Sequence, residues 1–404
     1  MIVSYIIAAV TAGLCALTYA ELAGMFPISG SAYTYSYVAF GEIIAFAVGW
    51  DLILENVVAG AAIASGWSGA LVGLLGEFDI HFSDKLISSP LNGGVIDLPA
   101  ILITAFVTLF LYWGVKETAR FNTIFVIIKV VVILLFVAIG ASHIDLSNYS
   151  PFAPFGWKGV MTGAALVFFS FIGFDSVSTT AEEVKDAQKN VPRALLICLS
   201  IVVVLYVSVS VVVIGIIPYR MIDVGNALPS ALSHIGIHWG SALVAVGAIL
   251  GMVATLLVCL YAQIRIFMCM SRDGLLPSVF NKIHPRHKTP YICTVITGAA
   301  TAVLAGVLPI NALMELCNIG TLFAFFLVSV GIIVLRRTMP DVERKFKCPG
   351  VPITPLVSAG FSLYLMISLP LLTWMRFLTW FVLGLIIYFL VGRKNSRLQN
   401  DKIQ

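Results

Sequence analysis

An apolar stretch interrupted by helix-ending residues is the part of this sequence best suited to bind a ligand. Residues 163–171 resemble part of a membrane helix, but Gly173 and Asp175 follow where the chain should still be crossing lipid. Backbone groups in hydrocarbon must be satisfied within the protein, so a helix breaks at that depth only where it lines a cavity or packs against protein. The freed carbonyls can bind a cation, and a helix N-terminus can face a carboxylate. The alternative is a glycine kink followed by a helix outside the membrane.

Three charged side chains fall inside apolar segments. Lys129 stands in the apolar run 125–134, where a lysine costs about 2.5–3.5 kcal/mol on insertion scales, which favours a functional role. Because burial favours the neutral amine, proton exchange is feasible there, and the alternative is a charged lysine bonded to carbonyls at a helix break. Asp51 and Glu55 are four residues apart and share one helix face. Glu55 is the deeper and the better candidate for facing a pocket, whereas Asp51 is equally suited to a hydrogen bond with a neighbouring helix.

Other polar residues are expected to be structural. Glu21 and Arg265 fall near the same end of segments that should pack together, which predicts an ion pair, with snorkelling of Arg265 as the alternative. Glu182 and Glu183 resemble a catalytic carboxylate pair, but they open a loop rich in Lys and Arg, which predicts a solvated charge cluster. For Asn318 we expect a hydrogen bond between helices rather than a role in lining a vestibule.

The composition places all these residues in a helical membrane protein. Of the 404 residues, 60% are hydrophobic and 11% charged, whereas roughly 25% are charged in soluble proteins. The formal net charge of +4 does not indicate a nucleic-acid partner. No motif indicates a cofactor or a metal, and an enzyme in the membrane would need reactive groups at depth, where no histidine is predicted. The seven cysteines show no C-x-x-C spacing, which predicts free thiols. Nothing indicates an oligomeric state.

The elements that must position these residues are apolar segments of roughly 20 residues, the length that crosses a bilayer. We predict eleven, over 2–24, 40–75, 96–115, 121–141, 159–180 (broken), 195–217, 241–270, 291–308, 313–335, 355–372 and 374–391. Short loops join them, so a single integral-membrane domain over 1–404 is expected. Lys and Arg concentrate in the loops on one side, which predicts a cytosolic C-terminus and an N-terminus outside.

The order of these segments repeats within the chain. After the broken segment come a plain helix, a long one and two more, and the N-terminal region offers the same four in the opposite orientation, as inverted repeats require. The first repeat would cover 1–141, without a counterpart of the broken helix, and the second 159–335. Two extra spans over 355–391 and a cytosolic tail over 392–404 complete the chain.

Several motifs recur along the chain in a familiar order: YAEL at 19–22, FPISGSAYTY at 26–35, GWDLILE at 49–55, FIGFD at 171–175 with AEE at 181–183, and SRDGLLP at 271–277. Together they resemble the amino acid–polyamine–organocation superfamily, and within it the cationic amino acid transporter branch and its bacterial relatives. The resemblance implies an all-α, LeuT-like bundle of five-plus-five inverted repeats with two extra C-terminal helices. This chain has eleven spans against that pattern because it lacks the first helix, whose glycine-rich break holds the substrate carboxylate in the family.

The resemblance also implies a function and a site. It implies secondary active transport of amino acids across the cell membrane, coupled to protons, with Lys129 at the position that sodium occupies in sodium-coupled relatives. It assigns the carbonyls of Phe169, Ser170 and Ile172 to the substrate ammonium, and the Phe169 ring to closing over the substrate. Gly173 supplies the torsional freedom of the break.

The remainder of the expected site lies on two other helices. The substrate side chain should face the helices that bear Glu55 and Cys259. Read without the resemblance, Phe169 and the phenylalanines at 168, 171 and 174 are ordinary core aromatics. The alternative functions are a non-transporting or truncated permease-like protein with a sensing role, and an amino acid exchanger.

Overall fold

The protein is a bundle of helices, seen in a computed structural model that describes residues 1–76, 79–80, 82–114, 118–222 and 226–396. Val115, which ends one predicted segment, and residues 397–404 of the predicted tail lie outside the described residues. The α-helices are α1 (Ile2–Met25), α2 (Ala32–Phe40), α3 (Glu42–Gly76), α4 (Leu98–Trp113), α5 (Thr118–Ala141), α6 (Gly156–Val167), α7 (Ser176–Thr179), α8 (Ala187–Ile216), α9 (Ala227–His234), α10 (His238–Arg272), α11 (Tyr291–Val307), α12 (Ile310–Thr338), α13 (Ile353–Ile367), α14 (Leu371–Ile387) and α15 (Arg393–Asn395).

Short 3₁₀ turns and one π-helical turn complete the described elements: η1 (Asp84–Leu86), η2 (Pro90–Asn92), η3 (Leu146–Tyr149), η4 (Phe168–Phe171), η5 (Ala181–Glu183), η6 (Tyr219–Met221), η7 (Ser278–Asn281) and the π-helical η8 (Tyr388–Gly392). Extended pairing in the described part of the chain is limited to one isolated bridge between Ile87 and Asp97.

The helices are those of a polytopic membrane protein. Among the described residues, eight helical stretches are long and apolar enough to span a bilayer, and α4, α11 and α13 are shorter apolar helices. Every predicted segment lies on one of these helices. The stretch Gly156–Thr179, which joins α6, η4 and α7, is one of the eight. The physical reason is length, because about 20 helical residues at 1.5 Å each cross the roughly 30 Å hydrocarbon layer.

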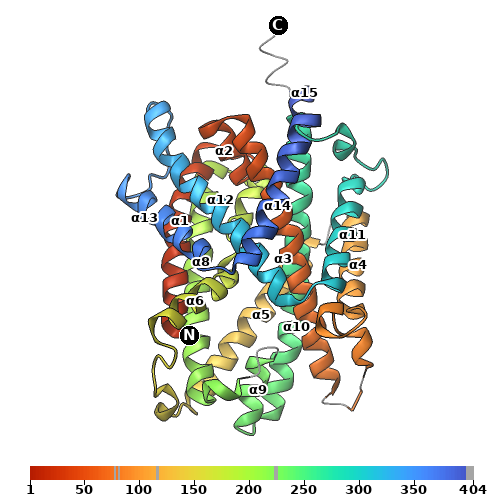
Figure 1. Ribbon diagram of the computed structural model, residues 1–404. Coiled ribbons are helices and arrows are strands. Elements are labelled where there is room, and N and C mark those ends of the chain that lie inside the picture. The colour runs from red at the N-terminus through yellow and green to blue at the C-terminus, as the bar shows by residue number, and fades with distance from the viewer. Residues whose placement is uncertain (77–78, 81, 115–117, 223–225, 397–404) are drawn as a thin grey trace.

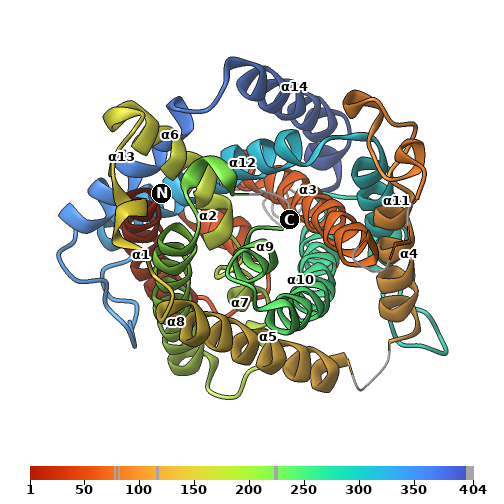
Figure 2. The same ribbon diagram turned by 90° about the horizontal axis from the view of Figure 1, so that it is seen from below.

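The two 35-residue helices, α3 and α10, pack against each other (Figure 1). α12 packs along α3, α1 packs against α8, and α4 and α11 form a pair at one edge. Seen along the bundle (Figure 2), α7 lies inside the ring made by α1, α8, α5, α10 and α3, and α14 lies outside α12. In its most apolar window α3 is 78% buried, against 17% for α5, so α3 is a core helix and α5 a peripheral one.

Two short helices were not predicted, and they occupy matching places in the chain. α2 has 9 residues and precedes α3, whereas α9 has 8 residues and precedes α10. The long helices that follow them have 35 residues each, and the next helices, α4 and α11, have 16 and 17. α2 and α9 lie at opposite ends of the bundle (Figure 1). The elements from α2 to α4 and from α9 to α11 therefore follow the same order with similar lengths.

Candidate functional site

The predicted interruption of the membrane helix is confirmed. Regular α-helix ends at Val167, and a 3₁₀ turn follows over η4. Ile172 is then extended (ψ 143°), and Gly173 adopts a φ of +105° that side chains with a Cβ rarely tolerate. Helical structure resumes only at Ser176, the first residue of α7. Gly173 is exposed, and a Cβ there would meet nothing within 4 Å, so the break borders open space.

The break leaves backbone acceptors without their helical donors. The Phe169 carbonyl accepts from the Ile172 N–H at 3.2 Å, so only its second lone pair remains. Within the described part of the chain, no backbone N–H donates to the carbonyls of Ser170 or Ile172. Unsatisfied carbonyls inside a membrane protein are costly unless a ligand or water bonds them. The arrangement can therefore accept hydrogen bonds from a cationic ligand.

The phenylalanines around the break divide into two groups. Phe168, Phe171 and Phe174 are buried in the core, and the rings of Phe168 and Phe174 lie 5.9 and 5.2 Å from that of Phe325. These three residues are core aromatics, as the alternative reading expected. Phe169 is only half-buried and packs against the edge of this core.

A group of buried carboxylates lies beside the break. Glu55 and Asp51 are buried on α3, and Asp175 is buried between Gly173 and α7. Glu55 is close enough to Asp175 and Asp51 to interact electrostatically with both. Among the described residues, both Asp51 oxygens, Glu55 Oε2 and Asp175 Oδ1 have no hydrogen-bond partner. Buried polar groups are normally paired, so these oxygens have capacity left for a proton or a ligand.

Asp51 faces α12, because a Cβ on Gly320 would lie 2.8 Å from its Oδ1. The hydrogen bond that was the alternative role of Asp51 is not found among the residues that the structure describes. Cys259, on α10, lies within electrostatic range of both Glu55 and Asp175. The fold thus brings Glu55 and Cys259, which are about 200 residues apart in the sequence, close to each other and to the break.

Sequence reasoning missed three members of this group. Asp175 was read only as a residue that interrupts a helix, although an acidic side chain within an apolar segment is itself a signal of function. The hydroxyls of Tyr19 and Tyr35 are buried and have no partner in the described part of the molecule. Their rings lie 5.8 Å apart, and Tyr19 also contacts Phe174 at 5.9 Å. Their signal was the polar YAEL and FPISGSAYTY motifs inside apolar sequence.

Lys129 lies on the inner face of α5, against α10. A Cβ on Gly251 would lie 2.8 Å from Lys129 Cδ, so the aliphatic part of the lysine packs on that glycine. Gly251 precedes Cys259 by eight residues on α10, which corresponds to about 12 Å along the helix axis. No hydrogen bond or ion pair of the Lys129 ammonium occurs among the described residues. The coupling role of Lys129 stays a prediction.

Comparison with known proteins identifies the family. The sequence pattern of the amino acid permease family matches residues 1–392. The chain belongs to the amino acid permease family. The methylthioribose transporter of Bacillus subtilis (strain 168) is 44% identical over 400 residues, covering 98% of this chain and 87% of that protein. The branched-chain amino acid permease BcaP of the same organism is 44% identical over 403 residues, covering 98% and 86%. The vacuolar cationic amino acid transporter 4 of Arabidopsis thaliana is 38% identical over 361 residues, covering 87% and 58%.

These matches confirm the resemblance to the cationic amino acid transporters and their bacterial relatives. The permease is a multi-pass membrane protein of a transporter family and not an enzyme. The break and the carboxylates beside it therefore have to be judged as a place that binds and releases a solute, not as a place of covalent chemistry.

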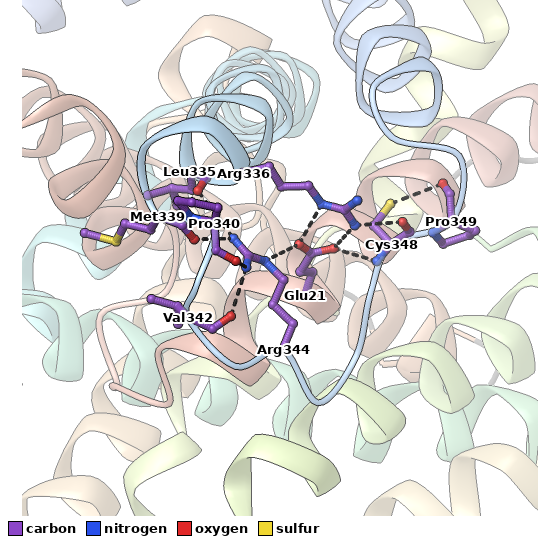
Figure 3. A network of polar contacts seen from close by, with 9 residues as sticks. All are labelled: Glu21, Leu335, Arg336, Met339, Pro340, Val342, Arg344, Cys348 and Pro349. Atoms are coloured by element: carbon purple, nitrogen blue, oxygen red, sulfur yellow. Dashed lines mark hydrogen bonds and ion pairs between the residues drawn. The ribbon is translucent and has the colours of Figure 1, made fainter.

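One predicted ion pair of the permease is wrong. Glu21 does not pair with Arg265; its Oε2 lies 2.7 Å from Arg336 Nη2, and its Oε1 lies 3.1 Å from Arg344 Nε (Figure 3). The Cys348 N–H also donates to Glu21 Oε2 at 2.6 Å. Arg336 lies in the last turn of α12, and the loop after α12 brings Arg344 and Cys348 to the same carboxylate. A contact made by a loop has no periodic signal in the sequence.

Arg265 has a different partner, which also corrects the reading of Glu182 and Glu183. Arg265 pairs with Glu183, and Glu182 Oε2 lies 3.6 Å from Arg272 Nη2. Glu182 also accepts from the Ser29 N–H at 3.1 Å. The two glutamates therefore join η5 to α10 and to the turn before α2, and they are more than a solvated charge cluster.

The expected role of Asn318 between helices is confirmed. Its Nδ2 donates to the carbonyls of Ala165 and Leu166 at 3.0 and 3.5 Å. These carbonyls belong to the last turn of α6, which ends at Val167. Asn318 thereby anchors the end of α6 to α12, immediately before the candidate site.

Proposed function

We propose that this permease carries amino acids across the cell membrane by proton-coupled secondary active transport, with alternating access around the break between η4 and α7. One observation carries the proposal. The Ser170 and Ile172 carbonyls, which accept no backbone hydrogen bond, lie in the same region as buried oxygens of Glu55 and Asp175 that have no partner among the described residues. An amino acid brings an ammonium group, which needs several acceptors when it leaves water. Family membership supports the solute class.

The proposed orientation of the substrate follows from the polarity of the site. Its ammonium would bond the carbonyls of Ser170 and Ile172 and the remaining lone pair of Phe169, with the Phe169 ring closing over it. The torsional freedom of Gly173 keeps these carbonyls out of the helix. The substrate side chain would point toward α3 and α10, where Glu55 and Cys259 lie.

The proposed architecture is a five-plus-five inverted repeat crossing the membrane eleven times in this chain. The repeats would be 1–141 and 159–335, with two additional spans over 355–391. The matching lengths of α3 and α10, and of the short helices before them, support this division. The opposite placement of α2 and α9 supports the inversion (Figure 1). The distribution of Lys and Arg supports a cytosolic C-terminus.

Lys129 is proposed to couple transport to protons. The aliphatic part of Lys129 packs against Gly251, and its ammonium has no acidic partner among the described residues. We infer that a water molecule or the substrate stabilises the charged form. A lysine in such a place exchanges its proton readily because burial opposes its charge. Proton exchange at Lys129 would then alternate with substrate occupancy.

The relatives define the solutes to test. Their names include branched-chain amino acids, cationic amino acids and methylthioribose. All of these solutes except the last carry the α-ammonium that the carbonyls at the break would bind. We expect leucine-like or lysine-like amino acids to be transported, and methylthioribose to test whether the ammonium is required.

The test is uptake of radiolabelled leucine, lysine and methylthioribose into proteoliposomes, with and without an inward proton gradient. We expect amino acid uptake to be stimulated by the gradient, and Lys129→Met to abolish this stimulation. Lys158→Met, at an exposed position before the break, is the matched control and should retain it. Gradient-dependent uptake by Lys129→Met would refute the coupling role. Substrate binding without any uptake would indicate a sensor, and uptake only into vesicles preloaded with amino acid would indicate an exchanger.

A further inference from the structure

A basic cleft lies at the start of α8, on the surface of the bundle. It has a volume of about 810 Å³ and lies between Pro27, the first turns of α8, and the loop that follows α12. Three cationic side chains line it, Lys189, Arg193 and Lys345, against one acidic side chain, Asp186. The cleft contains none of the residues of the candidate transport site. Its charge fits an anion that several cations can contact at once.

The walls of the cleft are held in place by contacts inside the protein. The end of α1 packs closely on the start of α8, since a Cβ on Gly24 would lie 3.1 Å from the Gln188 carbonyl oxygen. The opposite wall is held by the ion pair between Glu21 and Arg344 (Figure 3). Lys345 is the next residue after Arg344 in the sequence. Lys345 pairs with Glu343, but both side chains are exposed, and such surface pairs contribute little. Lys345 can therefore exchange this weak contact for one with a phosphate group.

An apolar stripe continues from the cleft along α8. Arg193 is followed on the same helix face by the exposed side chains of Ile197, Ile201 and Val204. The spacings of four, four and three residues keep these side chains on one face. A charged end followed by an apolar stripe has the polarity of an amphiphile. A free phosphate would use the cations and leave the stripe unused.

We propose that this cleft binds the phosphate headgroup of an anionic phospholipid, with an acyl chain lying along the exposed face of α8. Arg193 supplies a planar fork that bonds two phosphate oxygens, while Lys189 and Lys345 act as point charges. Basic pockets at the membrane surface are suited to anionic headgroups, because the cytosolic leaflet attracts Lys and Arg. The bound lipid bridges α8 to the loop after α12, so it stabilises the packing of these two elements.

Binding is tested on the full-length purified permease with phosphatidylglycerol as the probe. Native mass spectrometry counts bound lipid, and thermal unfolding measures stabilisation across a lipid titration. The test variant is the triple substitution Lys189→Gln, Arg193→Gln and Lys345→Gln. The control is Lys282→Gln, Arg286→Gln and Lys288→Gln, which makes the same change in charge at exposed positions of another loop. Phosphatidylcholine and glycerol phosphate are the parallel arms for charge and for the acyl chain.

We expect phosphatidylglycerol to bind and stabilise the wild type and the control, and the cleft variant to bind it roughly 100-fold more weakly, which corresponds to about 1 kcal/mol for each lost cation. Arg193→Gln alone should weaken binding by roughly five-fold, in the same direction, if the triple variant is poorly folded. Equal binding by the cleft variant and the control would overturn the proposal. Equal stabilisation by glycerol phosphate would overturn the lipid assignment. Neither readout depends on transport.

Discussion

Two buried glutamates in this protein differ in their hydrogen-bond and ion-pair partners. Glu21, on α1, is 0% exposed and contacts two arginines and a backbone N–H. Glu55, on α3, is 4% exposed, and one of its carboxylate oxygens has no partner in the described structure. The same is true of Asp175 beside it. Burial is therefore equal at the two sites, and the number of partners is what differs.

The difference separates structure from function. Removing a carboxylate from water costs several kcal/mol, and a protein recovers this cost only through well-placed partners. At Glu21 the partners are built in, so the site has no capacity left for a ligand. At Glu55 and Asp175 one carboxylate oxygen each has no partner among the described residues, which is the state expected of a site that a proton or a solute completes.

The largest expected effect comes from breaking the satisfied site. Glu21→Ala leaves Arg344, whose side chain is 7% exposed, without a counter-charge, and the free energy of unfolding should fall by about 3–5 kcal/mol. Thermal unfolding followed with a thiol-reactive dye measures this, because most of the cysteines are buried until the protein unfolds. Glu343→Ala, at an exposed position in the same loop, is the control and should change stability by less than about 0.5 kcal/mol.

Cys348 gives a local reading of the same variant. Burial, with a smaller contribution from Glu21, raises the pKa of the Cys348 thiol to about 11, so the thiol is protonated and unreactive at neutral pH. Loss of Glu21 frees the loop from the Cys348 N–H contact, and alkylation of Cys348 should become faster. Unchanged stability together with unchanged Cys348 reactivity would remove the basis of the comparison.

This contrast was only partly visible in the sequence. Hydropathy predicted the segments, and Gly173 with Asp175 predicted the break, because both signals are local. The partners of Glu21 were predicted wrongly, because they lie at the end of α12 and in the loop that follows it, and the path of that loop is not encoded in a periodic pattern. The proximity of Asp175 to Glu55 depends on how the helices are rotated about their axes. A helix that is apolar on all faces carries no signal of that rotation in its sequence. The helices α2 and α9 were missed because they are too short to span a bilayer.

The second expected effect concerns the unsatisfied site. Glu55→Gln keeps the shape of the side chain but removes its charge, so uptake should fall at least about ten-fold, since hydrogen bonds to charged groups contribute about 1.5–3 kcal/mol. Stability should stay the same or rise slightly, because an unpaired buried carboxylate is lost. Glu315→Gln is the matched control, because Glu315 accepts from the Thr373 hydroxyl at 2.7 Å and an amide oxygen can replace it. A loss of stability without a loss of uptake would mean that Glu55, like Glu21, has a structural role.

A smaller effect is expected at Asn318, which anchors the end of α6 to α12. Asn318→Leu removes the hydrogen bonds to Ala165 and Leu166, and interhelical bonds of this kind contribute about 0.6–1.7 kcal/mol in membrane proteins. Thr321→Val is the control, since the Thr321 hydroxyl donates to the Cys317 carbonyl of its own helix at 3.1 Å. Thermal unfolding should distinguish the two variants. If Thr321→Val costs as much as Asn318→Leu, the anchoring of α6 is not the source of the effect.

The smallest effect tests whether burial, rather than ion pairing itself, makes Glu21 important. The Arg265–Glu183 pair also joins two elements, but its side chains are 19% and 51% exposed. Water competes for such a pair, so a double-mutant cycle with Arg265→Gln and Glu183→Gln should give a coupling energy of only about 0.2–1 kcal/mol. The same cycle on Glu21 and Arg344 should give several times more. Equal coupling energies would mean that exposure does not determine how much these ion pairs contribute to stability. A ligand site at Glu55 would then no longer be supported, because that inference assumes that a buried carboxylate oxygen without a partner is energetically costly.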